Sequence, residues 1–360
     1  MKNLKFIFLF LVALSFNSCQ DLLNEDPEYT LNNKTVFETE KSANIALLGC
    51  YGYLTNYDTY GQTIPELSVN ASGFAWSQTN GGGSDLFNSM NTVPTDSQLS
   101  TMWGGLYKAI GQCNFFIDAI SKSTLSDKYK KNASGQAKFV RGLCYYNLAT
   151  YFGGVPLRIQ PTTAEDLNIP KSSQMDVFKQ VEKDWLDAAN DLLPKQDPSA
   201  KVGMGTKYAA YAYLTKLYFM MASQENTSSS PYWAKAKAAG DEVILNGGYS
   251  LEPKFANLFK NYVASSPESI FQLNFTTTST LVGNRTSWVF SPANSTTGIS
   301  FARVRSSKSF YDFFKGTYLD DPRLKETFIT TWKQIKTNNA NVFSYPYTSK
   351  TVAGVIVVAD

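Results

Sequence analysis

The sequence has 360 residues, a formal net charge of +3 and no histidine. The absence of histidine excludes Ser-His-Asp and Cys-His catalysis and any zinc site with a histidine ligand. The charge is nearly balanced and no long basic block occurs, so nothing indicates a nucleic-acid partner.

The first residues, 1–18, are typical of an export signal. Two lysines precede the apolar stretch 6–16, which is shorter than the about 20 residues that a membrane-spanning helix needs. A serine and then Cys19 follow, and this arrangement resembles the lipoprotein box of bacterial lipoproteins. A plain secretory signal is the alternative. We predict a signal peptide at 1–18, lipidation at Cys19 and a polar tether over 19–40.

Amphipathic helical periods dominate the middle of the chain. Apolar residues recur at i, i+3 or i+4, and i+7 in six segments: 41–55, 98–122, 134–152, 173–193, 205–224 and 231–246. Alanines on these faces allow close helix packing, and successive helix pairs of this length are typical of a tetratricopeptide-like stack. An irregular helical domain is the alternative. The predicted fold is mainly α, with long loops and minor β structure.

Several residues are expected in the interior of this stack. The tryptophans in helical segments are Trp103, Trp185 and Trp233, and the apolar stripe of 231–246 ends at Ile244. The cysteines after residue 19 are Cys50, Cys113 and Cys144, and each has apolar neighbours. An odd number of cysteines excludes a fully paired disulfide framework, so we expect buried free thiols.

Two long segments, 56–97 and 276–300, are rich in glycine, serine, threonine and asparagine and interrupt the helical pattern. Long loops in a compact domain are usually functional or disordered. Between the helices and the second loop, the alternation in 269–275 predicts a strand.

Several stretches follow one another in an order typical of a known family. They are CQDLLNEDP, MWGGLYKAIGQCNFFIDAI, AKFVRGLCYYNLATYFGGVPL, VFKQVEKDWLDAANDLLP, GTKYAAYAYLTKLYF, YWAKAKAAGDEVI, FANLFKN, ESIFQLNF and DDPRL. The aromatic helix that ends in YFGGVPL is the most specific. Over nearly its whole length, the chain resembles the SusD/RagB-like outer-membrane nutrient-binding lipoproteins.

The chain departs from the family pattern in two places. Cys144 stands where an aromatic residue or alanine is more usual. The family's chains also continue past the AGVIVVAD ending to a further helix near an Arg-Tyr-Ala-Glu stretch, which is missing here. We therefore expect a SusD-like helical-repeat domain over 41–360 that lacks its C-terminal end.

The resemblance implies a function without catalysis, cofactor or metal. Such proteins are lipid-anchored on the surface of the outer membrane and cap a SusC-like TonB-dependent β-barrel transporter. They hold a glycan, or in some cases a peptide, and pass it inward as the cap closes.

The two long loops carry the residues that suit a sugar ligand, which needs flat aromatic platforms and a few hydrogen-bonding groups. We expect ligand contacts from Trp76, Asp85, Asn88 and Trp288, with Phe74, Phe290, Asn284 and Arg285 nearby. None of them matches a fixed family motif, so position in the loops and chemistry alone select them. The alternative for each tryptophan is that it packs its loop onto the helices.

Three other functions stay open at this point. One is a peptide-capturing member of the same family, and another is a helical-repeat scaffold that binds proteins only. The third is a helical glycoside hydrolase, which would need two carboxylates on either side of the scissile bond. Asp85 and Glu66 are the loop acids to test first, because Glu182, Asp184 and Asp187 are expected on solvated helix faces.

Lipidation of Cys19 is directly testable. Several acyl chains would anchor the protein firmly, because each buried CH₂ contributes about 0.8 kcal/mol. Mass spectrometry of the N-terminal peptide from the mature protein should therefore find residue 19 acylated and residues 1–18 removed. An unmodified thiol at Cys19 in a cytosolic protein would contradict the prediction.

Overall fold

Helices make up most of the chain that the computed structural model describes. It describes residues 35–77, 91, 93–164, 167–260, 266–275, 284–285, 289–290, 304–329, 331–333, 342–344 and 355–356. The predicted signal peptide, Cys19 and most of the predicted tether lie outside these residues.

The helices and strands are the following. The helices are α2 (Glu40–Leu54), α3 (Thr63–Asn70), α5 (Ser97–Lys122), α6 (Asp127–Phe152), α7 (Gln174–Asp191), α8 (Lys207–Glu225), α9 (Pro231–Asn246), α10 (Asn257–Lys260), α12 (Lys308–Thr317) and α13 (Arg323–Thr327). The strands are β1 (Ala75–Ser77), β2 (Val304–Ser306), β3 (Phe328–Ile329), β4 (Thr331–Lys333), β5 (Val342–Ser344) and β6 (Val355–Ile356). They form antiparallel pairs of β1 with β2, β3 with β6, and β4 with β5.

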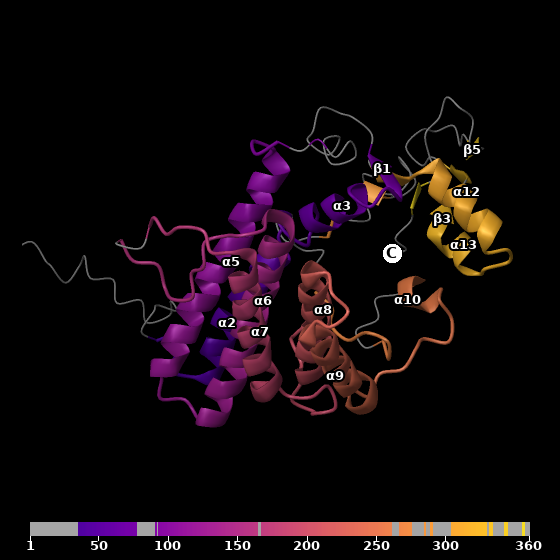
Figure 1. The fold of residues 1–360 in the computed structure, drawn as a ribbon. Coiled ribbons are helices and arrows are strands. Elements are labelled where there is room, and N and C mark those ends of the chain that lie inside the picture. The colour runs from indigo at the N-terminus through magenta and orange to yellow at the C-terminus, as the bar shows by residue number, and fades with distance from the viewer. Residues whose placement is uncertain are drawn as a thin grey trace, which may run out of the picture.

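The long helices pack in sequence order. Helix α5 contacts α6, α6 contacts α7, α7 contacts α8 and α8 contacts α9, while α2 lies against both α5 and α6. Figure 1 shows this stack at one side of the molecule and α12, α13 and β3, drawn in yellow, at the other. The predicted mainly α, tetratricopeptide-like fold is confirmed.

Capping side chains explain where the helices begin. Oδ1 of Asp96 accepts hydrogen bonds from the backbone N–H groups of Gln98 and Leu99, at 2.9 and 3.1 Å, at the start of α5. Serine or threonine does the same before α2, α6, α7, α8, α9 and α12. These bonds satisfy amides that have no partner within the helix, so the sequence defines each start locally.

Close contact between α6 and α7 depends on one glycine. A Cβ at Gly142 would overlap the indole of Trp185, which is fully buried. The Nε1–H of this indole donates to the carbonyl oxygen of Phe139 at 3.2 Å. The glycine in the RGLCYY stretch thus makes room for the largest buried side chain of the stack.

A buried ion pair joins the same two helices. Arg141 donates from Nε and Nη2 to the two carboxylate oxygens of Asp184, at 2.8 and 2.7 Å. The two side chains are 6% and 1% exposed, so the expectation that Asp184 lies on a solvated face is wrong. Burial alone would lower the pKa of the Arg141 guanidinium, but the hydrogen bonds and charge of Asp184 outweigh it and raise that pKa.

The expected interior is mostly confirmed. Cys50, Cys113 and Cys144 are free and fully buried, and burial raises the pKa of the latter two thiols. Two parts of it are exceptions. Trp103 of α5 is only half-buried, and on α9 Ile244 is 78% exposed and Trp233 is half-buried beside the exposed ring of Phe219. The rest of the α9 stripe is buried at Ala236 and Val243, together with Ala239, because α8 packs on its small-residue side.

Two further expectations need correction. Residues 269–275 form no strand: Phe271 packs edge-on against Phe139 of α6, with ring centroids 5.0 Å apart, and none of the described strands pairs with the segment. The long segment 56–97 is not loop throughout, since it contains α3 and β1. Over the described residues, no helix combines the length and apolar character needed to cross a membrane.

The ion pair predicts a large difference between two aspartates on α7. Asp184→Ala should lower the free energy of unfolding by about 3–5 kcal/mol, because it leaves the Arg141 charge buried without its partner. Asp187→Ala removes the more exposed pair with Lys138, at 2.8 Å, and should cost about 1 kcal/mol or less. Urea denaturation of both variants measures the difference, and equal losses would contradict the structural role of Asp184.

Candidate functional site

Two segments far apart in the sequence meet at the start of α3. The guanidinium carbon of Arg285 lies 3.6 Å from the ring centroid of Tyr57. The backbone N–H of Arg285 donates to the carbonyl oxygen of Gly61 at 2.9 Å, and its Nη1 donates to Oε1 of Gln62 at 3.5 Å. The two polar segments that the sequence selects for ligand binding are therefore in contact.

A tight turn before α3 supports this contact. The N–H of Gly61 donates to the carbonyl oxygen of Asn56 at 2.9 Å, and a Cβ at Gly61 would lie only 2.7 Å from that oxygen. The buried hydroxyl of Thr59 donates to the carbonyl oxygen of Tyr53 at 2.7 Å. Glycine and threonine thus fix the turn that presents Tyr57 and the Gly61 carbonyl to Arg285.

Glu66 is not the loop acid that the sequence suggests. It lies on α3 and is 0% exposed. Its Oε2 accepts a hydrogen bond from Nε2 of Gln62 at 3.2 Å. An enclosed carboxylate cannot reach a glycan in solvent, so Glu66 does not supply one half of a glycosidase pair.

A small second core lies beside the contact. Ala75, Val289, Phe290 and Val304 are buried together, with Val69 of α3 packed against them. Strands β1 and β2 supply Ala75 and Val304, so this core joins the first segment both to residues 289–290 of the second and to the strand that follows it. Phe290 fills this core, so it is not one of the exposed aromatic platforms.

The predicted ligand contacts are only partly described. The backbone of Trp76 lies in β1, directly opposite Arg305 of β2. The side chain of Trp76 lies outside the described residues, as do Asp85, Asn88 and Trp288. Trp288 immediately precedes the small core in the chain, but its convergence with Trp76 stays a prediction.

Exposed aromatic surface is present at the edge of this region. Phe74 is 55% exposed, and its ring centroid lies 4.6 Å from that of Phe310 on α12. The backbone N–H of Ser307 donates to the carbonyl oxygen of Phe74 at 2.9 Å, which fixes the segment before β1. The contact of Tyr57 with Arg285 is not predicted from the sequence, although the run 51–60 is rich in tyrosine and could have indicated an aromatic contact there.

The described part of the site suits binding better than proton transfer. It combines the Arg285 cation, aromatic rings and neutral polar groups. Tyr60 accepts a hydrogen bond from Nδ2 of Asn147 at 2.7 Å, and burial raises its pKa, so its hydroxyl stays protonated at neutral pH. Such groups can stack on a ligand and share hydrogen bonds with it.

Comparison with known proteins gives one family. The SusD-like family model described as "Starch-binding associating with outer membrane" matches residues 22–219. Two SusD-like proteins of Formosa agariphila are 24% identical over 278 residues and 27% identical over 199 residues. These matches cover 75% and 53% of this chain but 51% and 38% of the relatives, so the chain spans about half the length of the curated relatives it matches, or less.

Solved structures share the fold at low sequence identity. A SusD superfamily protein from Parabacteroides distasonis has a TM-score of 0.75 at 20% identity, over 92% of this chain and 70% of its own. A SusD homologue from Bacteroides thetaiotaomicron has a TM-score of 0.73 at 20% identity, over 85% of this chain and 61% of its own. A protein described as a laminarin-binding SusD-like protein has a TM-score of 0.67 at 21% identity, over 82% of this chain and 67% of its own.

The contact between Arg285 and Tyr57 predicts a local effect on dynamics. Arg285→Ala removes a cation–π contact of about 0.5–2 kcal/mol, so amides in 56–62 should exchange with solvent several-fold faster. Hydrogen-exchange mass spectrometry should find α6 unchanged. Arg323→Ala, which removes a surface pair with Asp321, is the matched control, and equal effects on 56–62 would contradict the contact.

Proposed function

Because the chain belongs to the SusD-like family, whose model is described as starch-binding and associated with the outer membrane, we propose that it captures glycans at the cell surface. The observation that carries the proposal is the contact of Arg285 with Tyr57 and Gly61, which joins the two segments that hold Trp76 and Trp288. Two aromatic platforms on adjoining segments would grip the apolar face of a sugar chain. Hydrogen-bonding groups beside them would fix its orientation.

The expected affinity for a single sugar is weak. One platform that covers roughly 100 Å² of apolar sugar surface contributes about 2.5 kcal/mol before the costs of association. Two platforms therefore reach millimolar to micromolar binding, since a Kd of 1 mM corresponds to about −4 kcal/mol. Capture would improve for polymers that touch several contacts at once.

The proposed cellular setting follows from the N-terminal sequence and the family. Lipidation at Cys19 would anchor the protein to the outer membrane with its helical domain at the cell surface. A SusC-like TonB-dependent β-barrel transporter would then receive the glycan. Cap and barrel that grip one polymer together would hold it more tightly than either alone.

We propose binding without catalysis. The burial of Glu66 argues against the hydrolase that would use it with Asp85. Incubation with polysaccharides should produce no new reducing ends, and sustained turnover would overturn this part of the proposal. A peptide ligand and a scaffold that binds proteins only are not favoured by any specific contact of the described residues.

The double variant Trp76→Ala/Trp288→Ala tests the proposed site. It should greatly weaken retention of the protein by polysaccharide in affinity gel electrophoresis, because both platforms are lost. Laminarin is a rational first probe, given the name of one structural neighbour, and starch is the second.

Trp233→Ala is the matched control, since Trp233 is half-buried on α9 beside Phe219. Retention should survive in this control, and far-ultraviolet circular dichroism should be unchanged in the double variant. Retention that survives in the double variant would mean that the site is elsewhere.

A further inference from the structure

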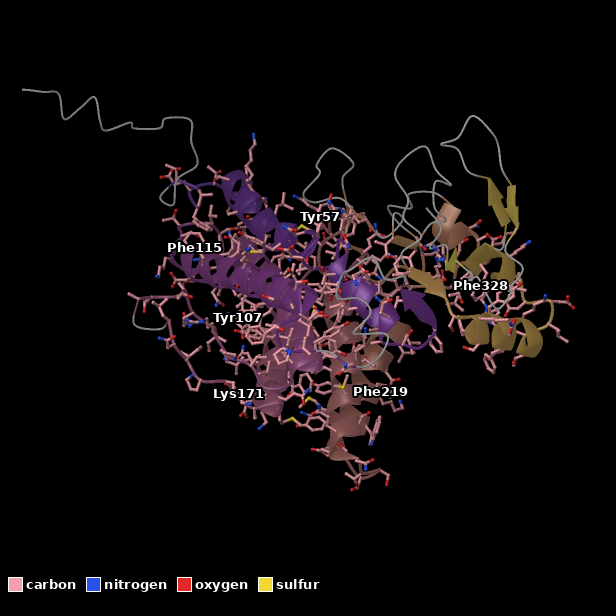
Figure 2. The ribbon with its side chains drawn as sticks, turned by 90° about the horizontal axis from the view of Figure 1, so that it is seen from above. Tyr57, Tyr107, Phe115, Lys171, Phe219 and Phe328 are labelled. Carbon is pink, nitrogen blue, oxygen red and sulfur yellow. The ribbon has the colours of Figure 1, made fainter. Side chains whose placement is uncertain are left out.

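A cavity of about 800 Å³ lies between α5 and the segments 156–162 and 167–170. This volume falls within the range of known small-molecule pockets, roughly 300–1,000 Å³. Figure 2 labels Tyr107 and Lys171 on this side of the helices, well apart from Tyr57 at the candidate site. The lining residues of the cavity do not include Tyr57, Gln62 or Arg285, which meet at the start of α3.

The outer wall of the cavity is held to the helices by side-chain hydrogen bonds. Nδ2 of Asn114 donates to the carbonyl oxygens of Arg158 and Gln160, at 2.9 and 3.1 Å. The hydroxyl of Tyr145 donates to the same Arg158 carbonyl at 2.8 Å, and that of Tyr107 donates to the carbonyl of Pro156 at 2.7 Å. Residues 156–160 of the wall are thus organised before any ligand arrives, which lowers the entropic cost of binding.

The helical wall offers aromatic surface. Trp103 and Tyr107 line the cavity, are half-buried, and have ring centroids 5.0 Å apart at an interplanar angle of 45°. Ile110 and Gly111 continue the same wall one turn along α5. A Cβ at Gly111 would meet nothing within 4 Å, so there is open space next to this part of the helical wall.

The opposite wall offers polar groups. Arg158 lines the cavity, and its Nη2 donates to the carbonyl oxygen of Leu167 at 2.7 Å, which orients a guanidinium that carries five N–H donors. Thr162 and Asn168 add a hydroxyl and an amide to the lining. No acidic residue lines the cavity among the described residues. Aromatic residues on one side and neutral or cationic donors on the other suit a sugar, which has apolar C–H faces and hydroxyl groups at its edge.

We propose that this cavity is a second carbohydrate site, which takes a terminal sugar or short oligosaccharide by stacking on Trp103 and Tyr107 and by hydrogen bonding to Arg158. The inference rests on the proposed function for its ligand class but not for its residues. Two sites on one molecule would let a single polymer bind at both, so retention of long chains would exceed the affinity for short ones.

The test narrows the cavity without disturbing the helix. Gly111→Leu places an aliphatic side chain in the open space beside the helical wall, and leucine has a better helix propensity than glycine. Gly104→Leu is the matched control, because Gly104 also lies on α5 with nothing within 4 Å of its Cβ but does not line the cavity. Both variants should melt at or above the temperature of the parent protein.

The experiment is saturation-transfer NMR with laminarihexaose, maltohexaose and tetragalacturonate, each at millimolar concentration. The parent for all variants is Trp76→Ala/Trp288→Ala, in which the proposed loop site is removed. The parent and its Gly104→Leu variant should transfer saturation to C–H protons of at least one sugar, and Gly111→Leu should reduce that transfer at least tenfold.

The outcomes separate the two proposals. No transfer in the parent, or equal transfer in the Gly111→Leu and Gly104→Leu variants, would overturn the cavity site. Polysaccharide retention that survives Trp76→Ala/Trp288→Ala but is lost with Gly111→Leu would instead overturn the loop site and support the cavity.

Discussion

The fold depends on one buried charge pair, Arg141 with Asp184. The bidentate geometry, at 2.7 and 2.8 Å, locks α6 against α7 in a single register, because a shift of either helix would leave a charge without its partner. The same guanidinium donates from Nη1 to Oδ1 of Asn114 at 2.8 Å and to the carbonyl oxygen of Ile159 at 3.1 Å. One side chain therefore ties together three helices and the extended segment that follows α6.

That network has a further role at the surface. Since Oδ1 of Asn114 accepts from Arg141, its amide nitrogen is turned toward the carbonyl groups of Arg158 and Gln160. Hydrogen bonds through Asn114 therefore connect the wall of the α5 cavity to the buried ion pair. A stack of helices can thus hold an irregular segment in place with a single β-bridge among its described residues, that of Pro156 with Lys171, because side-chain donors satisfy other carbonyl groups of the segment.

The sequence predicts the long helices well because each has its own periodicity and cap, and both signals are local. It fails where the deciding partner is distant. Asp184 has the sequence context of a solvated acid, and only the fold reveals that Arg141 lies opposite it. At the candidate site, composition selects two segments that meet in the structure, but the stacking of Arg285 on Tyr57 joins residues that no short pattern connects. Ile244 is exposed because α8 packs on a neighbouring face of α9, and the periodicity of α9 alone does not show which of its faces α8 will cover.

The buried thiols of Cys50, Cys113 and Cys144 have a practical consequence. A protonated, enclosed sulfur reacts slowly with maleimides, because the thiolate is the reactive species and the reagent must reach it. A cysteine introduced on an exposed loop of a fragment that begins after Cys19 would therefore carry a fluorophore almost alone. Two such cysteines, one among the strands and one on the helical stack, would carry a donor and an acceptor, so that the distance between them could be followed by energy transfer without first deleting the native cysteines.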